Sequence, residues 1–383
     1  MNIKPIAGIV LVASTLLATA GCASSTPADA EEPGAAPAGG STGCAVDAAA
    51  EEITEEAAAH ITELCEAASA AGEDELNVIS GLPDDMKTTF DAFTARFGIK
   101  INITNEIDPA LTADLQGQVQ SGNHVTDVLH NPNGQKYVDF AEPYHVESLQ
   151  IPEELEASAA ELQDPEDLYS SPLIGFFGLG TFLPRAGELQ PTKWSDLAEP
   201  EYAGLVGMGD PTVPGPNQDA PMYLTLNGAL DEQQVAGVFE NADGNVKGTY
   251  GDAVAGLMQG QFAFLFGAPS SAVYLASKQG APVKFSLMSE DNYVVTHKHL
   301  LIKDAPHPNA AKLYLEWLNT LEAGKAVSKA GLTPLNTNAA AETEKDQPWT
   351  NWKNANLTEI IPAADIDAGR QETVAKFKQM LGK

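Results

Sequence analysis

The chain has little positive charge, few cysteines and no apolar run long enough to cross a membrane. Lys and Arg number 21 against 53 Asp and Glu, which gives a formal net charge of −32 over 383 residues. So acidic a surface disfavours nucleic acid and anionic lipid headgroups as partners. The longest apolar run, residues 6–18, falls short of the roughly 20 residues that a membrane span requires. The acidity by itself indicates solubility or a salty habitat rather than a cationic ligand.

Signatures of catalysis are also missing. The sequence has no Gly-x-Ser-x-Gly elbow, no glycine-rich phosphate loop and no His-Glu-x-x-His helix, and its seven histidines are scattered. We therefore expect no enzyme and no cofactor. His297 and His299 lie two residues apart and share one face of a predicted strand, and imidazole is a good metal ligand. His124 and His130 flank another strand, but we assign no metal site.

The N-terminus has the organisation of a secretory signal. Lys4 supplies a positive charge, the apolar run follows, and small residues precede Cys22. We therefore assign residues 1–21 to a signal peptide. Residues 17–22, Leu-Ala-Thr-Ala-Gly-Cys, resemble a bacterial lipobox, in which the cysteine thiol takes a diacylglycerol, although Thr19 stands where such motifs usually carry Leu. The alternative is an ordinary secretory cut with Cys22 merely nearby.

Two acidic segments separate this signal from the main body. Residues 22–43 are mostly Ala, Pro, Gly, Ser and Thr, which cannot bury enough apolar area to fold and so indicate a flexible tether. Residues 44–75 predict an acidic helix, because apolar residues recur at helical spacing. These residues are Val46, Ile53, Ala57, Ile61, Leu64 and Ala68.

If Cys22 is acylated, Cys44 and Cys65 remain as an even pair outside the cell, where disulfides persist. Two cysteines alone do not make a closed zinc site. A straight helix would hold them roughly 31 Å apart, whereas a disulfide needs Cα atoms roughly 4.4–6.8 Å apart. We expect the disulfide only if the chain folds back after Cys44.

Beyond residue 75, short apolar strands alternate with helices, which predicts an α/β protein. A strand at 76–81 leads into a helix that Asp84 or Asp85 can cap, and a strand at 99–103 follows. The remaining elements are expected as helices at 111–120, 253–259, 270–279 and 310–321 and as strands at 125–130, 205–208, 262–266 and 294–302. About 340 residues remain after the signal and tether, enough for two lobes with a core each.

Four motifs occur in an order that resembles a known family. They are Ala-Ala-Ser-Ala-Ala-Gly at 67–72, Trp-Ser-Asp-Leu at 194–197 with Pro-Glu-Tyr-Ala-Gly at 200–204, Met-Gly-Asp-Pro-Thr at 208–212, and Ala-Pro-His-Pro-Asn-Ala-Ala-Lys at 305–312. In this order they resemble the substrate-binding lipoproteins of ABC importers with the type II periplasmic-binding-protein fold. The chain is most similar to the cluster that binds ferric iron, thiamine or polyamines, over about residues 60–340.

The resemblance implies two α/β lobes around a central cleft, with strands crossing between them near 172–183 and 284–302. Lobe 1 would comprise residues 76–172 and 290–383, and lobe 2 residues 173–289. It also implies a small solute as ligand and the membrane subunits of an ABC importer as partners. We expect a monomer on the extracytoplasmic face of the cell membrane, in the periplasm or at the cell surface, held there through its lipid anchor only.

Ligand contacts are expected beyond the carboxyl ends of the strands, where loops meet helix N-termini. The candidates are Ser80, Gly81, His130, Asn131, Asn133, Thr212, Tyr250, Ser270 and Tyr293. Each has a structural alternative: Ser270 can be a helix N-cap, and Tyr250 can pack in the core.

Two other functions stay open. Ferric iron or a ferric chelate is the alternative within binding proteins, but the family's ferric binders use adjacent tyrosines, and here Tyr144-His145 is the nearest substitute. A secreted α/β hydrolase is the alternative of another class.

Overall fold

The computed structural model describes residues 43–106, 109–132, 134–142, 144, 168–336, 338–339, 347 and 363–383. The predicted signal peptide, Cys22, almost all of the tether and the candidate Asn133 lie outside these residues. Residues 41–383 form one compact unit. Within the described residues, no helix has both the length and the apolar character that a membrane span needs.

The first sheet has four strands in the order β10-β3-β1-β2. β1 pairs in parallel with β2 and β3, while β10 pairs antiparallel with β3. The strands are β1 (Glu75–Ser80), β2 (Lys100–Asn105), β3 (Val128–Asn131) and β10 (Lys298–Leu301). The helices and the 3-10 helix of this part are α3 (Pro83–Phe97), α4 (Ala110–Ser121), η1 (Gly134–Phe140), α11 (Pro308–Trp317) and α12 (Leu321–Lys329).

Alternation along β1 supplies a core on each face of this sheet. Leu76 and Val78 pack with residues of α3 and α11, while Ile79 joins a separate cluster with Leu111 and Leu115 of α4. Successive side chains of a strand point to opposite faces, so one short apolar strand serves both layers.

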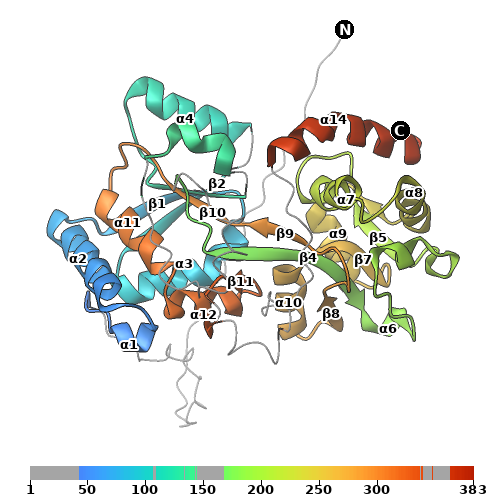
Figure 1. The fold of residues 1–383 in the computed structure, drawn as a ribbon, viewed down its shortest axis with the longest axis horizontal. Coiled ribbons are helices and arrows are strands. Elements are labelled where there is room, and N and C mark those ends of the chain that lie inside the picture. Colours follow the sequence, from blue (N-terminus) through green and yellow to red (C-terminus); the bar gives the residue numbers. More distant parts are fainter. Residues whose placement is uncertain are drawn as a thin grey trace, which may run out of the picture. The chain divides into compact units, whose positions relative to one another are not determined.

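The second sheet has seven strands. Its main order is β11-β4-β7-β5-β6, and β8 and β9 also pair with β4 (Figure 1). The strands are β4 (Leu173–Phe182), β5 (Val206–Gly209), β6 (Val246–Lys247), β7 (Phe264–Pro269), β8 (Val283–Ser286), β9 (Tyr293–Thr296) and β11 (Thr333–Pro334). The helices and 3-10 helices around it are α6 (Leu183–Ala186), η2 (Trp194–Ala198), η3 (Pro200–Tyr202), α7 (Pro216–Leu226), α8 (Glu232–Asn241), α9 (Tyr250–Met258) and α10 (Ser270–Lys278). The two mixed sheets, each with its own cores, confirm the expected two-lobed α/β fold.

Two consecutive strands, β9 and β10, link the sheets. β9 pairs with β4 in the second sheet, and β10 pairs with β3 in the first. Only His297 lies between β9 and β10, so the single strand predicted over 294–302 is divided there. The predicted crossings near 172–183 and 284–302 coincide with β4 and with β8 to β10.

The C-terminal helix α14 (Ala363–Met380) contacts α7. Arg370 donates a hydrogen bond to Asp219 over 3.0 Å, and Phe377 packs edge-on against Phe239 of α8. Residues 290–383 are all predicted to belong to lobe 1, whereas these contacts tie α14 to helices of the segment assigned to lobe 2. The lobe boundaries stay a prediction.

The N-terminal leader is two helices, α1 (Ala48–Glu51) and α2 (Glu55–Ala71), rather than the one helix that the apolar stripe predicts. Glu52 ends α1 in the left-handed conformation with φ 56°, and the Thr54 hydroxyl caps α2. The chain thereby folds back before α2 begins. This turn meets the geometric condition set for the cysteine pair.

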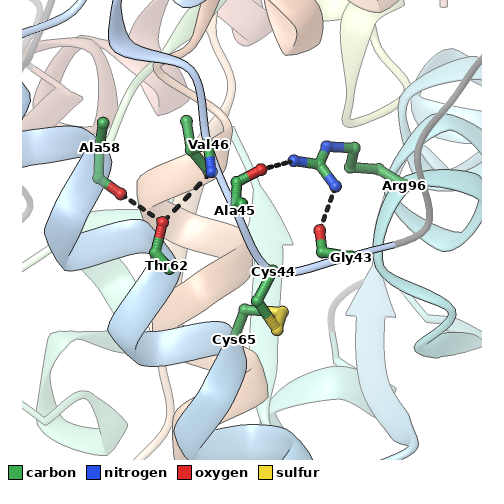
Figure 2. The surroundings of a disulfide bond; sticks show 8 residues. All are labelled: Gly43, Cys44, Ala45, Val46, Ala58, Thr62, Cys65 and Arg96. Carbon is green, nitrogen blue, oxygen red and sulfur yellow. Dashed lines mark hydrogen bonds between the residues drawn. A yellow bond between two sulfur atoms is a disulfide. The ribbon is translucent and has the colours of Figure 1, made fainter.

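Cys44 and Cys65 form a disulfide with their Cα atoms 5.3 Å apart (Figure 2). The Val46 N–H donates to the Thr62 hydroxyl over 3.2 Å. Arg96 of α3 donates to the carbonyl oxygens of Gly43 and Ala45. The disulfide therefore closes the leader on itself, and the hydrogen bonds from Arg96 fasten the start of the leader to α3 of the first lobe.

Candidate functional site

Four candidates lie together at the carboxyl ends of β1 and β3. Ser80 stands opposite His130 in the parallel register, and the Gly81 N–H donates to the His130 carbonyl over 3.1 Å. A Cβ on Gly81 would lie 2.8 Å from the Asn131 Nδ2, so a larger residue there would displace the Asn131 amide. The predicted convergence of these two loops follows from the parallel pairing of their strands.

Behind these loops lies a buried stack of three histidines, defined here as His130, His297 and His299. The Ser80 hydroxyl lies 2.9 Å from His130 Nδ1, and His130 Nε2 lies 2.9 Å from His297 Nδ1. The His299 ring stacks on His130 with the ring centroids 4.6 Å apart. The stack thus joins the ends of β1 and β3 to the residue at which the chain crosses between the sheets.

Burial lowers the pKa of His297 and of His299 to about 3, and it lowers the pKa of His130 well below its usual range. All three rings are therefore neutral near pH 7. Among the described residues, no three His, Cys, Asp or Glu side chains are arranged to hold a metal. Of the other residues considered for metal binding, His124 lies near Asp304, and the Tyr144 hydroxyl donates to Glu316 over 3.1 Å. His145 lies outside the described residues.

In the second lobe, the predicted hydroxyls bond to nearby protein groups. Thr212 donates from its hydroxyl to Asp210 Oδ1 over 2.7 Å, and Asp210 also pairs with Lys383. Ser270 is buried and donates to the Gly331 carbonyl over 3.0 Å. Thr212 is half-buried, so its loop remains accessible.

The two aromatic candidates are linked through one ring. Phe177 of β4 lies 6.0 Å from Tyr250 and 5.4 Å from Tyr293, measured between ring centroids. Tyr293 also packs against Tyr223 of α7 at 4.6 Å. Burial raises the pKa of both Tyr250 and Tyr293 well above the usual value, so both hydroxyls stay protonated.

A small cavity opens at the carboxyl ends of β5 and β7, with room for about one water molecule. It is lined by Met208, Gly209, Asn217, Ala220, Pro221, Tyr250, Ala253, Leu265, Phe266 and Gly267. A Cβ on Gly209 would lie 1.7 Å from Asn217 Oδ1, so glycine is required beneath this amide. The Tyr250 hydroxyl and Asn217 Oδ1 are buried and have no hydrogen-bond partner among the described residues. The loop motif predicted this region, but nothing in the sequence singled out Asn217.

Asp85 is the functional candidate that the sequence analysis missed. It stands in the first turn of α3, where either Asp84 or Asp85 could have been a cap, but the N-cap is Leu82, with no side-chain cap. Asp85 instead accepts a hydrogen bond from Ser271 of α10 over 3.0 Å, and burial raises the pKa of its carboxyl to about 6. The helix that follows β1 thus touches the helix that follows β7.

Two sheets with crossing strands and facing strand-end loops define a class, the periplasmic binding proteins. The spermidine/putrescine substrate-binding protein PotD of Streptococcus pneumoniae matches with a TM-score of 0.61 and 15% identity, over 80% of this chain and 99% of that one. Ferric ion-binding protein A of Pasteurella haemolytica matches with a TM-score of 0.60 and 18% identity, over 81% and 98%. AfuA of Actinobacillus pleuropneumoniae, solved with fructose-6-phosphate, matches with a TM-score of 0.58 and 17% identity, over 80% and 96%.

Residues 84–333 match the family model of the bacterial extracellular solute-binding proteins, and the chain belongs to that family. No curated protein sequence gave a significant match. The chain is accordingly an extracellular solute-binding protein and not an enzyme. The alternative of a secreted hydrolase is set aside on this ground.

Proposed function

We propose that the protein is anchored by a lipid on Cys22, captures a small solute between its two lobes and delivers it to the membrane subunits of an ABC importer. The lipobox-like residues 17–22 and the tether at 22–43 support the anchor. A disulfide between Cys44 and Cys65 suits an oxidising compartment outside the cytoplasm. A tethered monomer could reach a membrane partner while its lobes stay in water.

The observation that carries the capture step is the hydrogen bond between Asp85 and Ser271. These residues begin the helices that follow β1 of the first sheet and β7 of the second. Loops at the strand ends of both sheets therefore face each other, which is where ligands of α/β proteins bind. A solute that contacts both sets of loops would favour the closed arrangement of the lobes.

We propose the contacts from Ser80, Gly81, His130, Asn131 and Asn133 on one side and from Thr212, Tyr250, Ser270 and Tyr293 on the other. Truncating a hydroxyl or amide that a solute uses should weaken binding by roughly 1–3 kcal/mol. That is about a five- to 150-fold loss of affinity.

The test begins with mass spectrometry of the solute released by denaturing protein made in its host. Calorimetry with that solute then compares wild type with Ser80→Ala, Asn131→Ala, Thr212→Val and Ser270→Ala. Glu55→Ala, on the exposed face of α2, is the control that should bind like wild type. Wild-type affinity in all four site variants would contradict these contacts.

The anchor has a separate test. Labelling cells with a fatty-acid analogue should mark the wild-type protein and leave Cys22→Ala unmarked. Equal labelling of the two proteins would refute lipidation without touching the capture step.

Ferric iron, or its chelate, remains the second candidate. The structural likeness to ferric ion-binding protein A favours it. Equilibrium dialysis with ferric citrate, followed by iron analysis, would decide it.

A further inference from the structure

Asp85 lies between three elements that belong to different parts of the chain. Its carboxylate accepts one hydrogen bond, from Ser271 of α10, and the Tyr250 hydroxyl of α9 lies within electrostatic reach of its charge. An ionised carboxylate can accept about four hydrogen bonds. Among the described residues, Ser271 is its only hydrogen-bond partner, and no Lys, Arg or His forms an ion pair with it. The group therefore keeps most of its accepting capacity.

A partly buried carboxylate without a cation is unfavourable, because removal from water destabilises the charged form. The nearest charged group that acts on Asp85 is Asp84, which repels it. Tyr250 stays neutral, so it offers no compensating charge. A positive charge brought by a ligand would add to the Ser271 hydrogen bond and the N-terminus of α3 in stabilising the ionised carboxylate, for which the described residues supply no cation.

The cavity beside Tyr250 also offers atoms that accept hydrogen bonds. The Asn217 Oδ1 atom can only accept a hydrogen bond, and the Tyr250 hydroxyl can accept as well as donate. Both are buried without a partner among the described residues, and buried polar atoms are seldom left so. A solute that supplies N–H donors would satisfy both atoms, whereas an anion would meet Asn217 Oδ1 and the negative charge of Asp85.

We propose that Asp85 selects the charge of the solute, and that the solute carries a cationic nitrogen with N–H donors, such as a protonated amine or a guanidinium. This inference rests on the proposed function, because it assumes that the solute binds between α3 and α10. Asp85 holds the cationic group, while Tyr250 and Asn217 accept hydrogen bonds from donors on the same solute.

The test measures thermal stabilisation and calorimetric affinity at pH 7.5 for three defined panels. One holds primary diamines and alkyl guanidines, one holds dicarboxylates and sugar phosphates of similar size, and one holds neutral diols and sugars. Wild type is compared with Asp85→Asn, with the charge-retaining Asp85→Glu, and with Asp84→Asn, which alters the exposed neighbour on the same turn.

A member of the cationic panel should stabilise wild type and Asp84→Asn equally, and bind at least about tenfold more weakly to Asp85→Asn, with Asp85→Glu closer to wild type. Binding of that compound to wild type should weaken about tenfold between pH 7.5 and pH 5, because the carboxyl must lose its proton first. Asp85→Asn should lack this pH dependence.

Binding that is equally tight in Asp85→Asn, or a stabilising anion or neutral compound with no cationic one, would overturn the charge assignment and leave solute capture standing. No stabilisation of wild type by any panel would count against the proposed function as well, and the inference would fall with it.

Discussion

The carboxyl ends of the parallel strands carry buried polar side chains in both sheets, but these side chains differ in how they are satisfied. At the end of the first sheet, Ser80, His130 and His297 hydrogen-bond one another in a chain. At the end of the second sheet, the Tyr250 hydroxyl and Asn217 Oδ1 have no partner among the described residues. The side chains of this chain at the first sheet are already bonded within the protein, whereas the Tyr250 hydroxyl and Asn217 Oδ1 keep their hydrogen-bonding capacity for a ligand.

Lowering the pH should have the largest effect on the free energy of unfolding, because it acts on the buried histidine stack. Each histidine of the stack is neutral in the folded protein down to a pKa far below 6.5, whereas the unfolded chain takes up protons near 6.5. The unfolded state then binds more protons, so stability falls as the pH drops below about 6.5, by on the order of 4 kcal/mol per pH unit if all three take part. Urea unfolding at pH 7, 6 and 5 measures the free energy of unfolding. A value that stays constant over that range would show that the buried histidines do not destabilise the protein in acid.

Truncating the histidine stack should cause the second-largest loss of stability. His130→Ala leaves the Ser80 hydroxyl and His297 Nδ1 without their partner and opens a cavity in a fully buried site. We expect a loss of roughly 2–4 kcal/mol in the free energy of unfolding at pH 7. Denaturant titration measures it, with Ser69→Ala on the exposed face of α2 as the control that should change stability by less than about 0.5 kcal/mol. A loss no larger than that of the control would mean that the stack contributes nothing to folding.

The ionisation of Asp85 should change the stability with pH in the direction opposite to that of the histidine stack. Its pKa is raised to about 6 in the folded protein from 3.8, so the folded state is destabilised above pH 6 and relieved as the pH falls toward 4. Asp85→Asn should therefore raise the free energy of unfolding by about 1–3 kcal/mol at pH 8. The gain should vanish near pH 4. A variant that is less stable than wild type at pH 8 would show that the carboxylate supports the fold rather than a ligand.

The smallest effect on stability should come from the second strand end. Tyr250→Phe removes a hydroxyl that has no partner among the described residues. We expect the free energy of unfolding to change by less than about 0.5 kcal/mol, because no protein hydrogen bond is lost. Calorimetry on the co-purified solute should nevertheless find weaker binding. A destabilisation as large as that of His130→Ala would show that the Tyr250 hydroxyl supports the fold as the histidine stack does.

Much of the fold could be predicted from local pattern. Strand β1 and helix α3 follow from the spacing of their apolar residues, and the strand-end loops follow from parallel pairing. Of the candidates, Ser80, Gly81, His130 and Asn131 do lie together. The hydrogen bond from Ser270 to Gly331 left no signature in the sequence, because the two residues are 61 positions apart.

The sequence by itself determined the α/β alternation and the order of family motifs, since each is written in spacing along the chain. Only the tertiary structure decided that Asp85 rather than Asp84 meets Ser271, that three histidines stack where the chain crosses between the sheets, and that α14 packs on α7. Asp85 and Ser271 are 186 residues apart, and His130 and His297 are 167 apart. Periodicity fixes which face a residue occupies on its own element, but partners so distant are chosen by the packing of whole elements, which no local pattern records.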